Sequence, residues 1–173
     1  MKHSRATAVA LSATMARLGL TSCSSPLATQ TYLPEPAVLQ SAVDCSTANG
    51  WEVASTQPAA LLKGSVPEGF APDQVATCAM DPATMAVTEE WLSGGFGPLL
   101  AALATPSERG GPASCLDYGE ILPGIWLVNA AGEAVNAQWP MDSCGHSLPG
   151  TYEALKGLTV VSSKTVPGQE AAS

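Results

Sequence analysis

Five cysteines are the residues of this 173-residue chain whose spacing points most directly to chemistry. Cys23 closes an apolar N-terminal stretch, and four more follow at similar intervals: Cys45, Cys78, Cys115 and Cys144. An even number of cysteines after such an N-terminal stretch indicates two disulfides, as is typical of chains exported from the cytoplasm. Of the three possible pairings, the sequential one is favoured because shorter loops close more readily. We therefore predict the bridges Cys45–Cys78 and Cys115–Cys144.

Zinc coordination is the competing use of four cysteines. Structural zinc sites usually draw their ligands from closely spaced pairs such as C-x-x-C, and no such pair occurs in the sequence. A calcium loop of the D-x-D-x-D-G type is absent too, and the fifteen acidic residues are spread along the chain. The sequence therefore predicts no metal ion and no cofactor.

His146 is the other side chain with possible reactivity. It lies near Ser143 and Ser147 and two residues after Cys144, so a Ser–His or Cys–His nucleophile pair can be drawn. The G-x-S-x-G turn typical of many hydrolases is absent, and Cys144 is better used in a disulfide. A surface histidine in a loop is the favoured interpretation, and no catalytic residue is predicted. An extracellular hydrolase that uses His146 with Ser143 or Ser147 is the alternative.

Three further groups allow both a structural and a functional interpretation. The stretch at 94–98 resembles a phosphate loop, but no lysine lies near it, so a strand-to-helix connection is favoured. Glu89 and Glu90 could form an acid and base pair, yet neighbouring residues on a strand point to opposite faces. Tryptophans could line a ligand groove, although core filling is favoured, above all for Trp126; the four are Trp51, Trp91, Trp126 and Trp139.

Hydrophobic periodicity and turn residues predict the elements that must position these groups. Their order is β-β-α-β-β-α-β, which predicts an α+β fold: a small, largely antiparallel sheet with two short helices packed on it and two disulfides. The predicted elements are strands at about 74–80 and 84–92, a helix at about 98–105, a hairpin around residues 129–133, a helix carrying Tyr152, Leu155 and Leu158, and a strand at 159–161.

The N-terminus has the organisation of an export signal. Basic residues within the first five positions precede a mostly apolar stretch at 6–16, which is too short to span a bilayer. The LTSC motif at residues 20–23 resembles the bacterial lipobox, although Arg17 interrupts the apolar region. The resemblance implies cleavage before Cys23 and attachment of a diacylglycerol to its thiol. It places the protein on the extracytoplasmic side of the cell membrane, with the N-terminal lipid as its membrane contact.

Composition and this resemblance divide the chain into four parts. Residues 1–22 are the predicted signal peptide, and residues 23–42, rich in Ser and Pro, the lipidated N-terminus and a flexible tether. Residues 43–163 are the predicted disulfide-stapled globular domain. Residues 164–173 lack an apolar period and are predicted to form a flexible tail.

The charge balance limits the partners of the mature chain. Removing residues 1–22 removes three of the seven basic residues and none of the fifteen acidic ones, so the net charge changes from −8 to −11. Nucleic acid and anionic lipid headgroups would be repelled. Membrane attachment must then come from the lipid, and no nucleic-acid partner is expected.

The body of the chain resembles small exported proteins of high-GC Gram-positive bacteria. The similar features are VPEGFAPDQVATC, the GGFGPLLAALATPSE helix, the LVNAAGEAVNAQWPMDSCG hairpin and the EALKGL helix, which cover most of residues 65–158. The resemblance carries no activity to this chain. A non-enzymatic envelope lipoprotein that binds a protein or a small ligand outside the membrane is therefore the favoured expectation.

Overall fold

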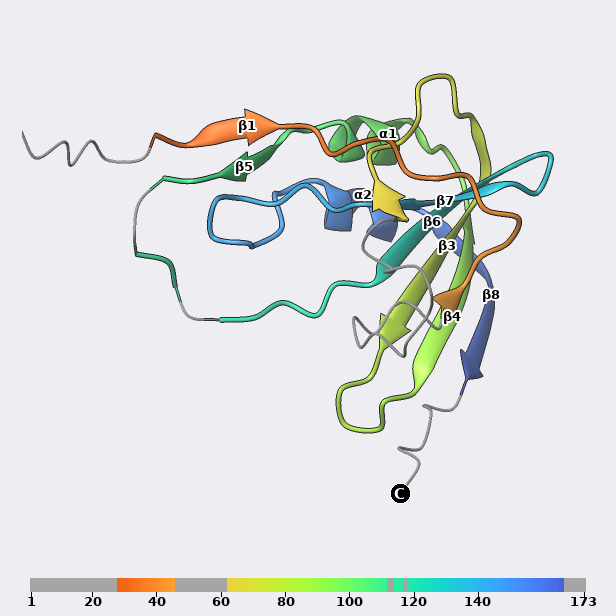
Figure 1. The fold of residues 1–173 in the computed structure, drawn as a ribbon. Coiled ribbons are helices and arrows are strands. Elements are labelled where there is room, and N and C mark those ends of the chain that lie inside the picture. The colour runs from red at the N-terminus through yellow and green to blue at the C-terminus, as the bar shows by residue number, and fades with distance from the viewer. Residues whose placement is uncertain (1–27, 46–61, 112–113, 117, 167–173) are drawn as a thin grey trace, which may run out of the picture.

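The computed structural model describes residues 28–45, 62–111, 114–116 and 118–166. Six strands form the main sheet in the order β2-β7-β6-β3-β4-β8, and β1 and β5 form a two-stranded ribbon that extends away from it (Figure 1). The elements are β1 (Gln30–Tyr32), β2 (Lys63–Gly64), β3 (Pro72–Met80), β4 (Val87–Ser93), α1 (Gly97–Leu103), β5 (Ser107–Arg109), β6 (Gly124–Asn129), β7 (Ala134–Ala137), α2 (Thr151–Lys156) and β8 (Thr159–Val166).

The predicted α+β class is confirmed, and so is the order of the seven predicted elements from β3 to β8. The sheet is larger than the small one predicted, and all its pairings are antiparallel except the one between β2 and β7. The sequence missed β1, β2 and β5 because each is only two or three residues long, too short for a period to appear.

β8 is longer than the strand predicted at 159–161. Its pairing with β4 continues to Val166, with Lys164 opposite Glu89, so residues 164–166 belong to the sheet and not to the predicted flexible tail. The prediction ended too early because this end of β8 is held by backbone hydrogen bonds to β4. Such bonds need no buried apolar side chain, so no apolar pattern marks these residues in the sequence. The remaining tail residues lie outside the described part of the chain.

Residues 30–42 differ from the flexible tether predicted for 23–42. β1 pairs with β5, Ala37 is buried, and Gln40 exchanges two backbone hydrogen bonds of 2.8 Å with Ala134. Gly64 allows this close approach, because a Cβ at that position would collide with the backbone of Glu35 and Ala37. The composition is that of a linker, yet the segment uses backbone bonds at the sheet edge, which composition cannot reveal.

One face of the main sheet is covered by α1 and α2. Leu99 and Leu103 of α1 and Leu155 of α2 pack into a core with buried residues of four strands. Pro98 in the first turn of α1 and Pro106 just after the helix account for its position and length. The sheet residues in this core include Val75, Leu92, Ile125, Leu127, Val135 and Ala137.

The opposite face of the sheet is also covered. Asn136, Trp126, Ala76 and Trp91 lie opposite one another on β7, β6, β3 and β4, so they form one row across this face. Cys78 lies on the same face two residues beyond Ala76 and is joined to Cys45, which sets the chain leading to Cys45 over the row. Burial on both faces explains why Trp126 is almost fully shielded from solvent.

Candidate functional site

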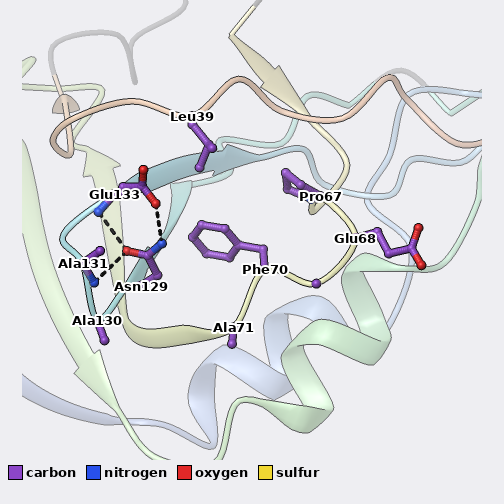
Figure 2. Close-up of a pocket in the computed structure, with 10 residues that line it drawn as sticks. Leu39, Pro67, Glu68, Phe70, Ala71, Asn129, Ala130, Ala131 and Glu133 are labelled. Atoms are coloured by element: carbon purple, nitrogen blue, oxygen red, sulfur yellow. Dashed lines mark hydrogen bonds between the residues drawn. The ribbon is translucent and has the colours of Figure 1, made fainter.

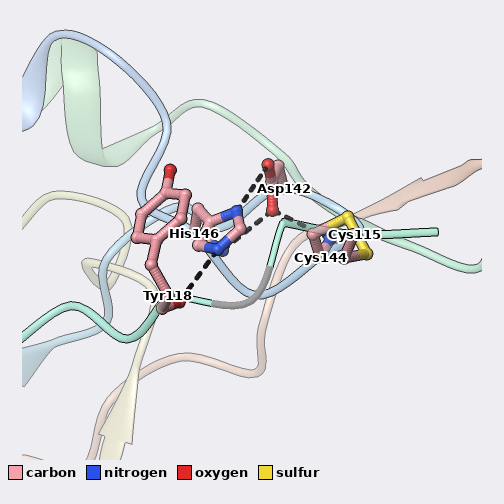
Figure 3. Close-up of a disulfide and its surroundings, with 5 residues drawn as sticks. All are labelled: Cys115, Tyr118, Asp142, Cys144 and His146. Atoms are coloured by element: carbon pink, nitrogen blue, oxygen red, sulfur yellow. Dashed lines mark hydrogen bonds and ion pairs between the residues drawn. A yellow bond between two sulfur atoms is a disulfide. The ribbon is translucent and has the colours of Figure 1, made fainter.

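Both disulfides are present with the predicted pairing. Cys45–Cys78 lies against the main sheet, and both of its cysteines are buried. Cys115–Cys144 lies at the periphery and joins two segments without helix or extended strand (Figure 3). The candidate site is built around this second bridge, because the reactive residues of the sequence gather there.

The loop from Asp142 to Ser147 is organised by one carboxylate. Asp142 Oδ1 accepts hydrogen bonds of 2.8 Å from the backbone N–H groups of Cys144 and His146. The Asp142 N–H donates in turn to the His146 carbonyl at 2.7 Å, and Gly145 supplies the positive φ of 81° that the turn requires. The loop therefore holds its shape through hydrogen bonds among its own residues, as is common in turns that contain an Asp side chain.

The His146 ring is held on both edges and on one face. Its Nδ1 lies 3.6 Å from Asp142 Oδ2, and its Nε2 lies 3.2 Å from the Tyr118 carbonyl oxygen. The Tyr118 ring stacks on the imidazole with centroids 4.0 Å apart and planes 5° apart, as Figure 3 shows. The His146 side chain is only 12% exposed. Both ring nitrogens therefore already face partners within the protein.

The same contacts act on the Asp142 carboxyl. The N–H of His146 is the main cause that lowers the pKa of Asp142 below its ordinary value. Partial desolvation opposes this change, while the Cys144 N–H and the His146 imidazole reinforce it. Each donor favours the ionised carboxylate, so the loop prefers a charged Asp142.

The two serines of the hydrolase alternative do not meet the His146 ring. Within the described residues, the imidazole bonds to Asp142 and Tyr118 and to no hydroxyl group. The contact of Ser147 in this region is made by its backbone N–H, which donates to Glu120 Oε2 at 2.6 Å. A histidine general base must reach the hydroxyl from which it removes a proton, so this arrangement does not favour the alternative.

Sequence reasoning missed the partners of His146. The D-x-x-G pattern at residues 142–145 is a turn signal that could have identified Asp142 as the organiser of the loop. Tyr118 and Glu120 contact this loop across 27 or 28 residues of sequence, and no local pattern indicates such a contact.

Together these contacts fix an irregular segment that we call the pinned segment, residues 114–116 and 118–122. It is attached to the 142–147 loop by the disulfide, by the Tyr118–His146 stack and by the bond from Ser147 to Glu120. Three of its apolar side chains nevertheless face solvent, while Leu122 packs against the core: Leu116 is 76% exposed, Tyr118 53% and Ile121 59%. A restrained segment with exposed apolar groups is suited to contact another molecule.

A separate groove of about 430 Å³ lies beside the β6–β7 turn. Figure 2 shows the Phe70 ring directed toward this turn and Glu68 pointing away from it. The polar groups of the turn are engaged with one another: Asn129 Oδ1 accepts from the N–H groups of Ala131 and Glu133, and Asn129 Nδ2 donates to Glu133 Oε2. The polar side chains of the turn are therefore already bonded to one another on this side of the groove.

The remaining sequence candidates have structural roles where the structure describes them. Glu89 and Glu90 are adjacent on β4 and so point to opposite faces of the sheet, and Glu89 accepts a 2.6 Å hydrogen bond from Trp91 Nε1. The 94–98 stretch connects β4 to α1, as predicted. Trp126 and Trp139 fill the core, and Trp139 Nε1 donates to the Pro123 carbonyl. Trp51 and the lipidation candidate Cys23 lie outside the described residues.

In the part of the chain that the structure describes, no three His, Cys, Asp or Glu side chains are grouped so as to hold a metal ion. No helix among the described residues is long and apolar enough to cross a membrane.

In comparisons with known proteins, no protein-family model, curated protein or solved structure matches the chain.

Proposed function

We propose that this protein is an exported lipoprotein, held by a lipid on Cys23 at the outer side of the cell membrane, whose domain binds a partner without catalysing a reaction. The pinned segment is the observation that carries the binding role. Its Leu116, Tyr118 and Ile121 each expose more than half of their surface, yet the segment is restrained by a disulfide and a ring stack. Restraint before binding reduces the entropy lost on association.

Export is supported by two features that are independent of each other. The N-terminal sequence has the order of a lipoprotein signal, with LTSC at residues 20–23. Four cysteines are joined in two disulfides, a state that persists in oxidising compartments and is rare in the cytosol. A membrane-held position also agrees with the acidic composition, since the lipid and not a basic surface supplies the attachment.

Mass spectrometry of the mature N-terminus tests the attachment. Expression of the full chain in a bacterium that processes lipoproteins should yield an N-terminal Cys23 that carries acyl groups. Cys23→Ala removes the thiol that would carry the diacylglycerol, and stable anchoring needs at least two acyl chains. This variant should therefore be released into the medium. An unmodified N-terminus at another residue would refute the lipid anchor.

Site-specific photocrosslinking tests the binding role of the pinned segment. A photoreactive phenylalanine replaces Tyr118 in one variant and Tyr152 of α2 in a matched control, since the two tyrosines are 53% and 54% exposed. In intact cells that naturally produce the chain, the variant at position 118 should form a discrete adduct that the variant at position 152 does not form. Equal labelling at both positions, or no adduct, would count against this surface.

A further inference from the structure

β8 leaves one side of the main sheet open. It is the last strand in the sheet order and pairs with β4 alone, so its other edge has no strand among the described residues. Figure 1 shows it at the border of the sheet. Residues 159–165 are all exposed, and Val160 and Val161 show 50% and 56% of their surface. An eight-residue strand therefore presents unpaired backbone N–H and C=O groups to solvent.

The two edges of the sheet differ in their protection. β2 is only two residues long, and the chain around Pro36 and Gln40 forms bridges beside it. β8 contains no proline and a single charged residue, Lys164, although such residues commonly protect an edge. Its one irregularity lies near Val161, where the register with β4 shifts. The stretch from Ser162 to Val166 is therefore a regular edge on which another strand can add.

We infer that β8 pairs in antiparallel fashion with β8 of a second copy of this chain, about a two-fold axis at Ser163. The interface between two identical edges must be self-complementary. Residues directly opposite each other in an antiparallel pair point to the same face of the sheet. A two-fold axis perpendicular to the sheet must therefore set one residue opposite the same residue of the other copy, and it cannot fall between two successive residues. An axis at Ser163 sets Ser162 opposite Lys164 of the other copy. An axis one residue further on would set the two lysines against each other.

Charge also favours this edge as the place where two copies meet. The chain carries a formal charge of −8, so most surfaces of two copies repel one another. Residues 159–166 contain no acidic residue and one lysine. Contact through β8 therefore avoids opposing carboxylates on the two strands, and salt that screens the remaining repulsion should strengthen the pairing.

Two lysine substitutions distinguish this interface from other contacts. Ser163→Lys places a lysine opposite Glu90 of β4 in the same chain, which favours the monomer fold. Across the two-fold axis, the same lysine lies opposite the substituted lysine of the other copy, and the two like charges repel. Thr165→Lys adds the same charge opposite Thr88, and across the axis it meets Val161 of the other copy and not another lysine. The second variant is therefore a matched control for net charge.

Sedimentation velocity of the full chain over a concentration series measures the dimer directly. We expect a weak dimer that tightens when NaCl rises from about 50 mM to about 300 mM. Ser163→Lys should weaken the association at least about fivefold and Thr165→Lys less than about twofold. Thermal unfolding of each variant checks that the monomer fold is intact.

Three results would overturn the inference. One is a chain that stays monomeric at every concentration and salt level. Another is a dimer that both lysine variants weaken equally, since that would place the contact outside the two-fold axis at Ser163. An added strand from an unrelated protein would appear as a heteromeric complex in the absence of any homodimer, and this outcome also rejects the second copy as the occupant.

Discussion

The main sheet and the pinned segment are each held by one disulfide, yet they are stabilised in different ways. The sheet has apolar side chains buried on both faces, and Cys45–Cys78 adds to a core that already includes Trp126. The pinned segment keeps Leu116 and Ile121 in solvent and has Leu122 partly buried against the core, so Cys115–Cys144 and a few polar contacts carry much of its order. Equal bridges can therefore have unequal effects, because their surroundings differ.

The largest expected effect comes from removing the bridge of the sheet. Cys45→Ala with Cys78→Ala should lower the free energy of unfolding by roughly 3–4 kcal/mol, from the loss of a closed loop. The buried position of Cys78 adds a packing loss. Thermal melting followed by circular dichroism should show a midpoint lower by about 10 °C or more.

The peripheral bridge supplies the control for this measurement. The two disulfides close loops of similar length, with separations of 33 and 29 residues, so chain entropy alone predicts nearly equal losses. A clearly larger loss for the sheet bridge would show that its burial matters. Equal losses would mean that the two regions are stabilised alike and that the contrast drawn above is wrong.

Removing the peripheral bridge should produce a smaller global effect and a larger local one. With Cys115→Ala and Cys144→Ala, we expect the melting midpoint to fall by less than half of the change seen for the sheet bridge. A segment with little buried apolar surface can open while the sheet stays folded. Hydrogen exchange of the Cys144, His146 and Ser147 amides, which donate to Asp142 and Glu120, should become fast while that of β3 and β6 stays slow. Unchanged protection of the 142–147 loop would contradict this expectation.

The same contrast explains which features the sequence predicted. β3, β4, β6 and β7 were predictable because alternating or apolar runs bounded by turn residues mark strands within a few residues of chain. The sequential disulfides were predictable because loop length favours one pairing. In both cases the information is local or depends only on spacing.

The contacts of the candidate site were not predictable for a physical reason. The Tyr118–His146 stack and the Glu120 bond to Ser147 join residues 27 or 28 positions apart in segments without a period. The strands β1 and β2 depend in the same way on distant partners, β5 and β7. Spacing supplied the cysteine pairing, but only the fold shows which side chains that pairing brings together.

The smallest expected effect is a pH-dependent change confined to the 142–147 loop. The pKa of Asp142 is lowered in the folded state, chiefly by the N–H of His146. A lowered carboxyl pKa gives a contribution to stability that is fully present above the ordinary value of about 3.9 and is lost as the pH falls through the folded-state value. Amide NMR signals of Cys144 and His146 should therefore shift below about pH 4 while those of β6 do not.

Asparagine at position 142 separates the charge from the shape of the turn. Asp142→Asn keeps an oxygen that accepts from both N–H groups, so the loop should stay folded but lose its titration step. Asp81→Asn is the matched control, because Asp81 lies in the β3–β4 turn and the Ala83 N–H is the main cause that lowers its pKa. That variant should leave the 142–147 titration unchanged. If Asp142→Asn retained the step, or if Asp81→Asn removed it, the loop would be responding to the whole fold, and the pinned segment could no longer be treated as a separate unit.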